Sequence, residues 1–405
     1  MNGATPLLAA VAILLAAGVG AGLLAQRLRV PDVVLYLLAG VALGPAFCGV
    51  LVLPADSSFC QLVLTFGAAY ILFEGGSEVK LEVLARIWVG LTALATAGVL
   101  VTVVVVAAAA HWSLDLDVPV ALLLGAVIAP TDPATLIPVF RQVKVRGRLA
   151  QMVVSESAFN DAVGAILTFT LLSLVTGHGH LPAAAVVVDF AREAGLGLLA
   201  GLLLGYLTAF LIGHHRFGLL SEYAPLATLL GVVGAYPVVE GLHGSGFMAV
   251  FVAGVVVGNR ERFSLRLAPD ATRRMHEYAG TTALLLRMAI FILLGTQVRF
   301  QVVGAHLGGA LAVTAILMFL ARPLSVFLCA APDRRAGWEL RELLFMCWTR
   351  ETGVIPGALA GMLLSMGAPE AETLAAVTFT AILATLLLQA TTTRWLAARL
   401  DLLEV

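Results

Sequence analysis

The stretch "VVSESAFNDAVGAILTFTLLSLV", residues 153–175, places two acids inside a segment that is otherwise mostly apolar. After its first few residues it has the composition of a membrane-spanning helix, yet it contains Glu156 and Asp161. An acid near the middle of a bilayer costs about 2.5–3.5 kcal/mol on insertion scales. Glu156 and Asn160 are four residues apart, as are Ser157 and Asp161, so each pair lies on one helical face. We therefore expect these polar residues to serve a function that offsets this cost.

The composition of the whole chain indicates a membrane protein. Of its 405 residues, 60% are hydrophobic and 12% are charged, whereas soluble domains carry about 25% charged residues. The chain is therefore predicted to be an all-α polytopic membrane protein, with thirteen spans found as windows of about 20 apolar residues. The predicted spans, numbered as segments 1 to 13, are 5–25, 32–53, 60–78, 87–110, 118–140, 150–176, 190–213, 223–240, 243–259, 281–298, 302–330, 341–365 and 370–393. We expect one membrane domain over residues 1–405 and no soluble regulatory domain.

The distribution of basic residues predicts the orientation of the spans. With the N-terminus outside, nineteen of the 24 Lys and Arg residues fall on the inner side. Arg192 and Arg299 lie near outer ends, and Arg287, Arg322 and Arg350 lie within spans. This asymmetry predicts a protein of the cytoplasmic (inner) membrane with its N-terminus outside and its C-terminus inside. The longest predicted loop, 259–280, is basic and suits an anionic inner leaflet.

The two halves of the chain resemble each other with inverted topology. Segments 2 and 9 share the pattern A-G-V-x-x-G, which begins at Ala39 and at Ala253. Segment 3 contains "YILFEGGSEV" and segment 10 contains the similar "IFILLGTQV". Both matches are seven segments apart, so the second copy crosses the membrane in the opposite direction. Such inverted repeats occur in several families of secondary transporter.

Segment 5 is predicted to contain a broken helix. It reads "LLLGAVIAPTDPATLIPVF", residues 122–140, and Pro130 and Pro133 bracket Thr131 and Asp132. Proline removes a backbone donor and clashes with the preceding turn, so the helix should break there. The alternative is that these prolines only kink a packed helix.

Segment 12, seven segments later, is predicted to be broken as well. It reads "FMCWTRETGVIPGALAGML", residues 345–363, with Arg350 and Glu351 beside Gly353 and Pro356. The ends of half-helices carry about half a unit charge. Asp132 can face the positive ends and Arg350 the negative ends. Two broken helices in corresponding halves, each with charged residues at its break, indicate a binding site near the bilayer midplane.

The side chains at these breaks suit a hard cation. Asp161 and Ser157 can present three oxygens to one point, and Asp132 and the broken backbone of segment 5 can add more. A proton and a cation would compete for the Asp161 carboxylate, which makes exchange possible. Glu156 is a buried acid that needs a partner, and Arg322 is a candidate. A structural role and direct ligation both remain open for Glu156.

The motifs as a set resemble those of the NhaP-type cation/proton antiporters, relatives of the animal sodium/proton exchangers. They are Thr131-Asp132-Pro133, then "SESAFNDAVG" with Asn160-Asp161, then the break at Arg350. The strings "GVALGP", "ILFEGG", "FVAGVVVGN" and "ARPLSVFL" add to the resemblance, which extends over essentially the whole chain. One departure is that Glu351 and Thr352 stand between the arginine and the glycine, where familiar members often have glycine directly.

The resemblance implies a homodimer of thirteen-helix protomers that exchange Na⁺, or alternatively K⁺ or Li⁺, for H⁺. Segments 1–3 and 7–10 would form a dimerisation part, and segments 4–6 and 11–13 a mobile core with crossing broken helices. The cation and proton would bind at Asp161, with Asp132, Ser157, the Thr131 backbone and Glu156 completing the site. Asn160 and Arg322 would support the core, and Arg350 and Glu351 would compensate charge at the breaks. Exchange is expected to be electroneutral, with one proton per cation, and no cofactor is expected.

Other interpretations of single features remain at this stage. The acid pair Asp132 and Asp161 could belong to an intramembrane protease, although no G-x-G-D motif is present. Broken charged helices also suit channels. Glu74, toward the inner end of segment 3, is either an acid of an inner funnel or an acid that snorkels toward the membrane surface. Cys48 and Cys60 flank one predicted outer loop, where small buried thiols are favoured over a disulfide.

Overall fold

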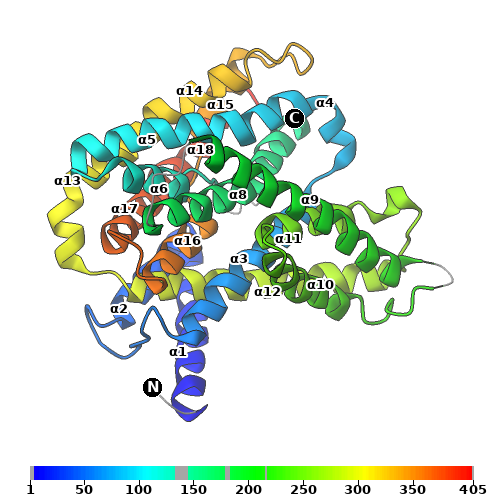
Figure 1. Cartoon of the computed structure of the whole chain (residues 1–405), viewed down its shortest axis with the longest axis horizontal. Coiled ribbons are helices and arrows are strands. Elements are labelled where there is room, and N and C mark those ends of the chain that lie inside the picture. Colours follow the sequence, from blue (N-terminus) through cyan, green and yellow to red (C-terminus); the bar gives the residue numbers. More distant parts are fainter. Residues whose placement is uncertain (1–3, 133–144, 178–182, 215–216, 404–405) are drawn as a thin grey trace.

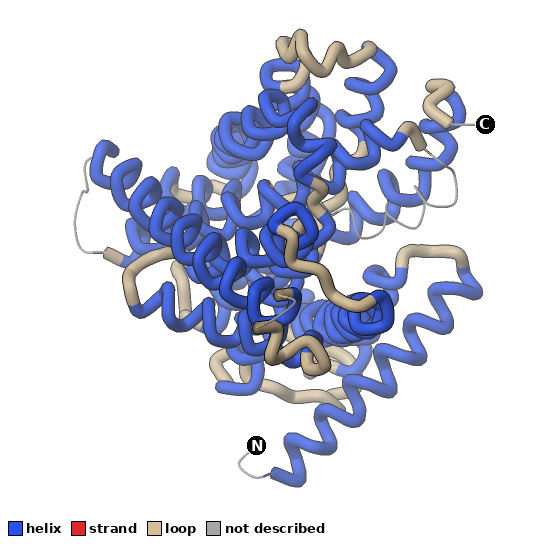
Figure 2. Tube along the Cα trace, turned by 90° about the vertical axis from the view of Figure 1, so that its right-hand side faces the viewer, coloured by secondary structure: helices blue, strands red, loops and turns tan. Residues whose placement is uncertain are grey.

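The computed structural model describes residues 4–132, 145–177, 183–214 and 217–403, and the chain is helical almost throughout these ranges (Figure 2). An isolated antiparallel bridge joins Val145 to Leu403. The α-helices are α1 Ala4–Leu28, α2 Asp32–Leu43, α3 Ser58–Glu78, α4 Leu81–Ala93, α5 Val99–Leu114, α6 Val118–Ile128, α8 Gly147–Thr176, α9 Ala183–Gly213, α10 Ala224–Gly241, α11 Gly246–Gly258, α12 Pro269–Thr296, α13 Phe300–Ile316, α14 Arg322–Cys329, α15 Leu340–Trp348, α16 Val354–Ser365, α17 Ala371–Thr385 and α18 Thr391–Arg399. Single π-helical turns at Leu94–Gly98, Leu317–Ala321 and Leu386–Ala390 join α4 to α5, α13 to α14 and α17 to α18.

The helices confirm a multi-pass membrane protein. Within the described ranges, nine continuous helical stretches are long and apolar enough to cross a membrane. Four shorter apolar helices, α2, α6, α11 and α16, occur beside them. Each of these stretches overlaps one of the predicted segments, although the number of complete crossings remains a prediction.

Two predicted boundaries were wrong. Segment 2 was expected to continue to residue 53, but α2 ends at Leu43, because the next residues, Gly44 and Pro45, do not favour a helix. The predicted loop 259–280 instead contains a 3₁₀ turn, Arg260–Phe263, and the first turns of α12. Proline suits the first position of a helix, so α12 begins at Pro269 and its charged first turns continue into the apolar part.

Two helix pairs confirm the inverted repeat. α2 packs against α12, and α11 packs against α3. A methyl group on Gly40 would overlap the carbonyl oxygen of Ile292, and one on Gly254 would overlap that of Phe73. Gly40 and Gly254 occupy the same position of the A-G-V-x-x-G pattern. Each copy of the pattern therefore packs against the neighbouring helix of the other half, and does so in the same way.

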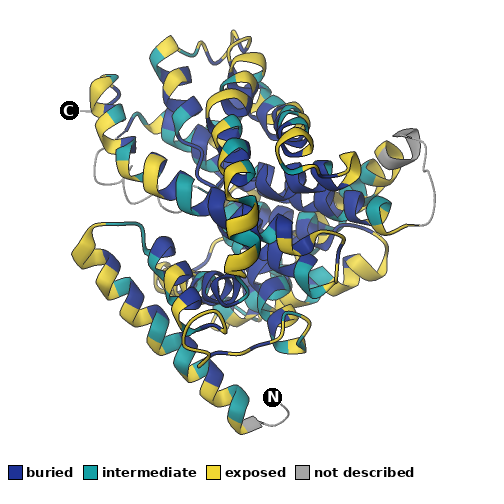
Figure 3. Cartoon of the chain, turned by 90° about the vertical axis from the view of Figure 1, so that its left-hand side faces the viewer, coloured by how far each residue is buried: buried dark blue, intermediate teal, exposed yellow. Residues whose placement is uncertain are grey.

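The helices form two groups that meet at α8. Figure 1 shows α5, α6, α13 and α17 gathered on one side, and α9, α10, α11 and α12 on the other. α8 contacts α6 in the first group and α3, α9 and α11 in the second. It is among the most buried of the long apolar helices, whereas α1 is the least buried and extends from the body with exposed apolar side chains (Figure 3). The helix with both acids therefore lies between the two groups.

Candidate cation and proton site

The breaks of segments 5 and 12 lie against each other. α6 ends at Ile128, and residues 349–353 separate α15 from α16. The backbone N–H of Asp132 donates a hydrogen bond to the Glu351 carbonyl oxygen, at 2.9 Å. Pro133 and the rest of segment 5 lie outside the described residues. The described parts of the two predicted breaks thus meet through their backbones.

Asp132 lies at the start of α16. Its Oδ2 accepts a hydrogen bond from the backbone N–H of Val354, the first residue of that helix, at 3.1 Å. A helix N-terminus carries partial positive charge, which stabilises a carboxylate. Gly353 lies so close to Asp132 that a methyl group at position 353 would overlap the Asp132 side chain. The glycine is therefore required for this approach.

Arg350 faces the other broken helix. Its Nη2 donates hydrogen bonds to the carbonyl oxygens of Ile128, at 2.7 Å, and Ala129, at 2.8 Å. These carbonyls are at the C-terminal end of α6, where helical carbonyls lack intrahelical partners and carry partial negative charge. Arg350 is 1% exposed, so the bonds form away from bulk solvent. The structure places Glu351 beside it, also buried, with its backbone carbonyl bound to Asp132.

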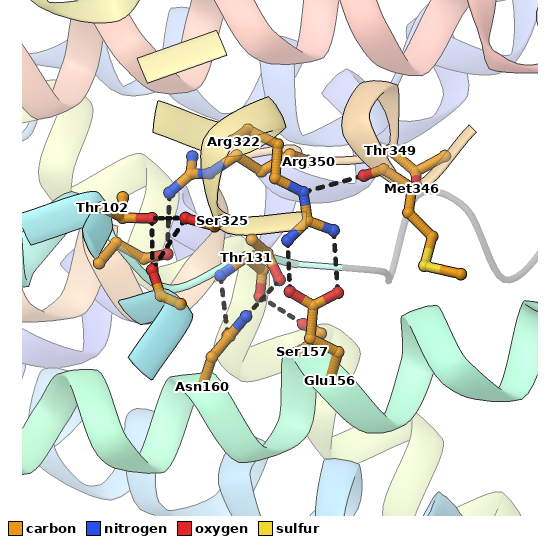
Figure 4. Close-up of polar contacts among 12 residues, drawn as sticks. Thr102, Thr131, Glu156, Ser157, Asn160, Arg322, Ser325, Met346, Thr349 and Arg350 are labelled. Carbon is orange, nitrogen blue, oxygen red and sulfur yellow. Dashed lines mark hydrogen bonds and ion pairs between the residues drawn. The ribbon is translucent and has the colours of Figure 1, made fainter. Parts of the chain in front are cut away.

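α8 holds the first break through a single residue, Thr131 (Figure 4). The Asn160 side chain accepts a hydrogen bond from the Thr131 backbone N–H, at 3.1 Å, and donates one to the Thr131 hydroxyl, at 2.9 Å. The Ser157 hydroxyl donates to the Thr131 carbonyl oxygen. Asn160 and Ser157 thus fix the backbone next to Asp132.

Asp161 lies at a cavity of about 510 Å³ that Ser157 and Asp132 also line. Asp161 is only 9% exposed. The Oδ1 atom is buried and has no hydrogen-bond partner in the described part of the chain. Three oxygen-bearing side chains therefore line one cavity, and one of their atoms still has full capacity to bind a proton or a cation.

The cavity wall also includes charges that the sequence did not assign to the site. Glu74 and Glu78 of α3 and Arg287 of α12 line it. Of the two interpretations of Glu74, the structure favours an acid at a funnel. Arg287 was recognisable only as a charge within a predicted span. Its place opposite α8 depends on the packing of distant helices, which no local sequence pattern specifies.

Glu156 has a different environment from Asp161. Both carboxylate oxygens accept hydrogen bonds from the Arg322 guanidinium, and the Nη2–Oε2 distance is 2.9 Å. Arg322 also donates through Nε to the Met346 carbonyl, at 2.9 Å. Glu156 is 2% exposed and is not among the residues that line the Asp161 cavity. The pair joins α8 to α14 and α15, and Figure 4 shows the two side chains facing each other.

Cys48 and Cys60 are both unpaired thiols. Cys60 is buried at the start of α3, whereas Cys48 is exposed in the connection between α2 and α3. The interpretation as small buried thiols therefore holds for Cys60 alone.

Three comparisons relate the chain to known proteins. The profile of the family described as "Sodium/hydrogen exchanger, transmembrane" matches residues 11–399. The chain is 32% identical to Na(+)/H(+) antiporter 1 of Methanocaldococcus jannaschii over 83% of its own length and 78% of that protein. It is 29% identical to the K(+)/H(+) antiporter NhaP of Alkalimonas amylolytica over 94% of its own length, and it spans only 64% of that relative. The solved structure of the sodium proton antiporter MjNhaP1 from Methanocaldococcus jannaschii superposes with a TM-score of 0.84, at 29% identity, covering 98% of this chain and 99% of that one.

Proposed function

Because the chain belongs to the sodium/hydrogen exchanger family, we propose that it is a secondary antiporter that exchanges a monovalent cation for a proton across the membrane. The observation that carries this proposal is the Asp161 carboxylate, which is buried at a cavity with an oxygen that no other described group binds. A buried charge without a partner is costly. A proton or a cation relieves that cost, so either one stabilises a loaded site.

Asp161 and Asp132 supply the carboxylate ligands of the cation in this proposal. Ser157 adds its hydroxyl oxygen, which keeps free lone pairs while its hydrogen is donated to Thr131. The Thr131 backbone completes the set. Oxygen ligands of this kind suit Na⁺, K⁺ and Li⁺. The relatives include a Na(+)/H(+) antiporter and a K(+)/H(+) antiporter. Na⁺ is the proposed substrate because the matched solved structure is that of a sodium proton antiporter.

Glu156 acts as a structural residue in this proposal, together with Arg322, Asn160, Arg350 and Glu351. Its two oxygens are already bound by one guanidinium, so ligation of the cation would require breaking a buried ion pair. The exchange then involves one titrating acid. One proton inward against one cation outward leaves the loaded site with the same charge on both strokes, which makes the cycle electroneutral.

The conformation corresponds to an inward-facing state if the N-terminus is outside. In that orientation the C-terminal end of α3 and the N-terminal end of α12, which line the Asp161 cavity, are on the cytoplasmic side. Alternating access would move the group around α5, α6, α8 and α13–α18 against the group around α1–α3 and α9–α12. The exposed apolar faces of α1 and α9 support the second group as the contact of a homodimer in the inner membrane.

The proposal is tested with purified protein in liposomes loaded with a pH-sensitive dye. Addition of Na⁺, K⁺ or Li⁺ outside a vesicle with an acidic interior should release internal protons, and the most effective ion identifies the substrate. Matched vesicles with the Asp161→Asn variant should show no cation-dependent release. Ion-driven current without proton movement would indicate a channel, and cleavage of a membrane-embedded peptide would indicate a protease. Either result overturns the proposal.

A further inference from the structure

A second cavity, of about 590 Å³, lies at the opposite end of α12 from the Asp161 cavity. Its wall includes Thr296 and Gln297 at the end of α12, Arg299 in the following turn, and Glu372 of α17. The connection between α2 and α3 forms the other side. Asp161 is not among the residues that line it, so the two cavities are separate in this conformation.

The inverted repeat relates the α12 wall of this cavity to the α3 wall of the first one. A methyl group on Gly44 would overlap the backbone of Thr296, and one on Gly258 would overlap that of Ser77. Gly44 and Gly258 are equivalent in the repeated A-G-V-x-x-G pattern, so Thr296 is the counterpart of Ser77. The residues that follow them, Glu78 and Gln297, therefore correspond as well.

Equivalent residues therefore line the two cavities at opposite ends of the protein. Ser77 and Glu78 line the Asp161 cavity, and their counterparts Thr296 and Gln297 line the second cavity. The other wall follows the same rule, because α8 lines the first cavity and α17, seven segments later, contributes Glu372 to the second. In an inverted-repeat transporter, equivalent helices open opposite ends of one route. The second cavity is thus the outer counterpart of the inner funnel.

An ion pair between the α12–α13 turn and the start of α17 borders the outer counterpart, and its two side chains are 69% and 45% exposed. Arg299 Nη1 lies 2.6 Å from Glu372 Oε1. Beneath this pair is a pocket too small for more than about one water, lined by Leu294, Gln297, Leu364 and Ala376 among others. Both amide atoms of Gln297 are buried and have no hydrogen-bond partner within the described ranges. A buried amide in that condition is costly unless another conformation or a bound species satisfies it.

We propose that the Arg299–Glu372 ion pair is the outer gate of the transport route, and that Gln297 is the first polar group beneath it. This inference rests on the antiport function proposed above. While the inner funnel is open, Arg299 neutralises Glu372 and the pair covers Gln297. When the α12–α13 turn moves away from the start of α17 and the pair separates, the Glu372 carboxylate attracts a cation and the Gln297 amide oxygen contacts it on the way to Asp161.

The gate is tested by labelling a cysteine beneath it. Ala376, which is buried in the small pocket, is replaced by Cys in a Cys48→Ser background, because Cys48 is an exposed native thiol. A membrane-impermeant maleimide is added outside intact cells. We expect slow labelling with the native gate, and labelling about fivefold faster when Arg299→Glu replaces the attraction by repulsion. The double variant Arg299→Glu/Glu372→Arg restores an ion pair and should return labelling to the slow rate.

Arg273→Gln is the matched control. It removes an exposed arginine of α12 whose ion-pair contacts, at 3.9 Å, lie at the opposite end of that helix, so it should not change labelling. Equal labelling in the native, single and double variants would overturn the gate, as would fast labelling that the double variant does not reverse. Because labelling requires no transport, it fails or succeeds independently of the liposome exchange assay that tests the antiport function.

Discussion

Two acids on α8, Glu156 and Asp161, have similar burial and opposite surroundings. Glu156 is held by both terminal nitrogens of Arg322 and is sealed between helices of the same group. Asp161 borders a cavity between the two groups, and one of its oxygens has no described partner. Burial alone therefore does not distinguish a structural acid from a functional one. The distinction is whether the protein itself supplies the compensating charge.

The largest expected effect is the loss of exchange in Asp161→Asn. Asparagine keeps the shape of the side chain but cannot carry the charge that alternates between proton and cation. Cation-dependent proton movement in liposomes should be abolished, while thermal stability in detergent is unchanged or higher, because a buried charge is removed. A variant that still exchanges at about a tenth of the native rate would place the titrating group elsewhere.

The structural role of Glu156 predicts a large effect on stability. Glu156→Ala or Arg322→Ala leaves one buried charge without its partner, which costs about 3–5 kcal/mol. Each single variant should unfold at a clearly lower temperature, and the double variant should recover part of the loss. The unfolding of all four proteins forms a double-mutant cycle, and strict additivity would show that the pair does not stabilise the fold.

Substitution of Arg350 should lower activity and stability less than the changes above, because part of what Arg350 contributes is its positive charge alone. Arg350→Ala leaves the Ile128 and Ala129 carbonyls without their donor, at a cost of about 1–3 kcal/mol. Arg350→Lys keeps the positive charge at the end of α6 and should lose less activity and stability. If both substitutions are equally damaging, the guanidinium geometry matters more than the charge.

Ser157→Ala should give the smallest effect of this series. It removes the hydrogen bond to Thr131 and one oxygen from the proposed cation site, while Asn160 still holds the Thr131 backbone. The apparent cation affinity should fall by about two- to tenfold, corresponding to about 0.5–1.5 kcal/mol for one hydrogen bond. Titration of exchange rate against cation concentration measures it, and an unchanged affinity would remove Ser157 from the ligand set.

The sequence was sufficient to predict the repeat and the positions of the breaks, because both depend on local chemistry. Glycines that allow close helix packing, and prolines beside charged residues, have the same consequence wherever they occur. Gly40 and Gly254 illustrate the first case, since each packs against a carbonyl of the opposite half. The pairing of Glu156 with Arg322 followed from the family resemblance and from the need of a buried acid for a partner.

Features that depend on how distant helices pack could not be predicted. The cavity at Asp161 has walls from α3, α8 and α12, and no periodicity in the sequence specifies that Arg287 and Glu74 share it. The extension of α12 to Pro269 was missed because its first turns are charged, so the apolar window of segment 10 begins only after them. Hydropathy detects the part of a helix inside the bilayer and not the part beyond it.

The most direct test of the central claim, that a proton and a cation compete for Asp161, is the pH dependence of the apparent cation affinity. Each bound cation displaces one proton, so on the acidic side affinity should strengthen about tenfold per unit of rising pH, equivalent to about 1.4 kcal/mol, and level off once the acid is deprotonated. The measurement is exchange rate against cation concentration in liposomes over a series of equal internal and external pH values. A tenfold change per unit supports competition at one carboxylate. An apparent affinity that does not change with pH across that range would show that proton and cation bind at separate sites.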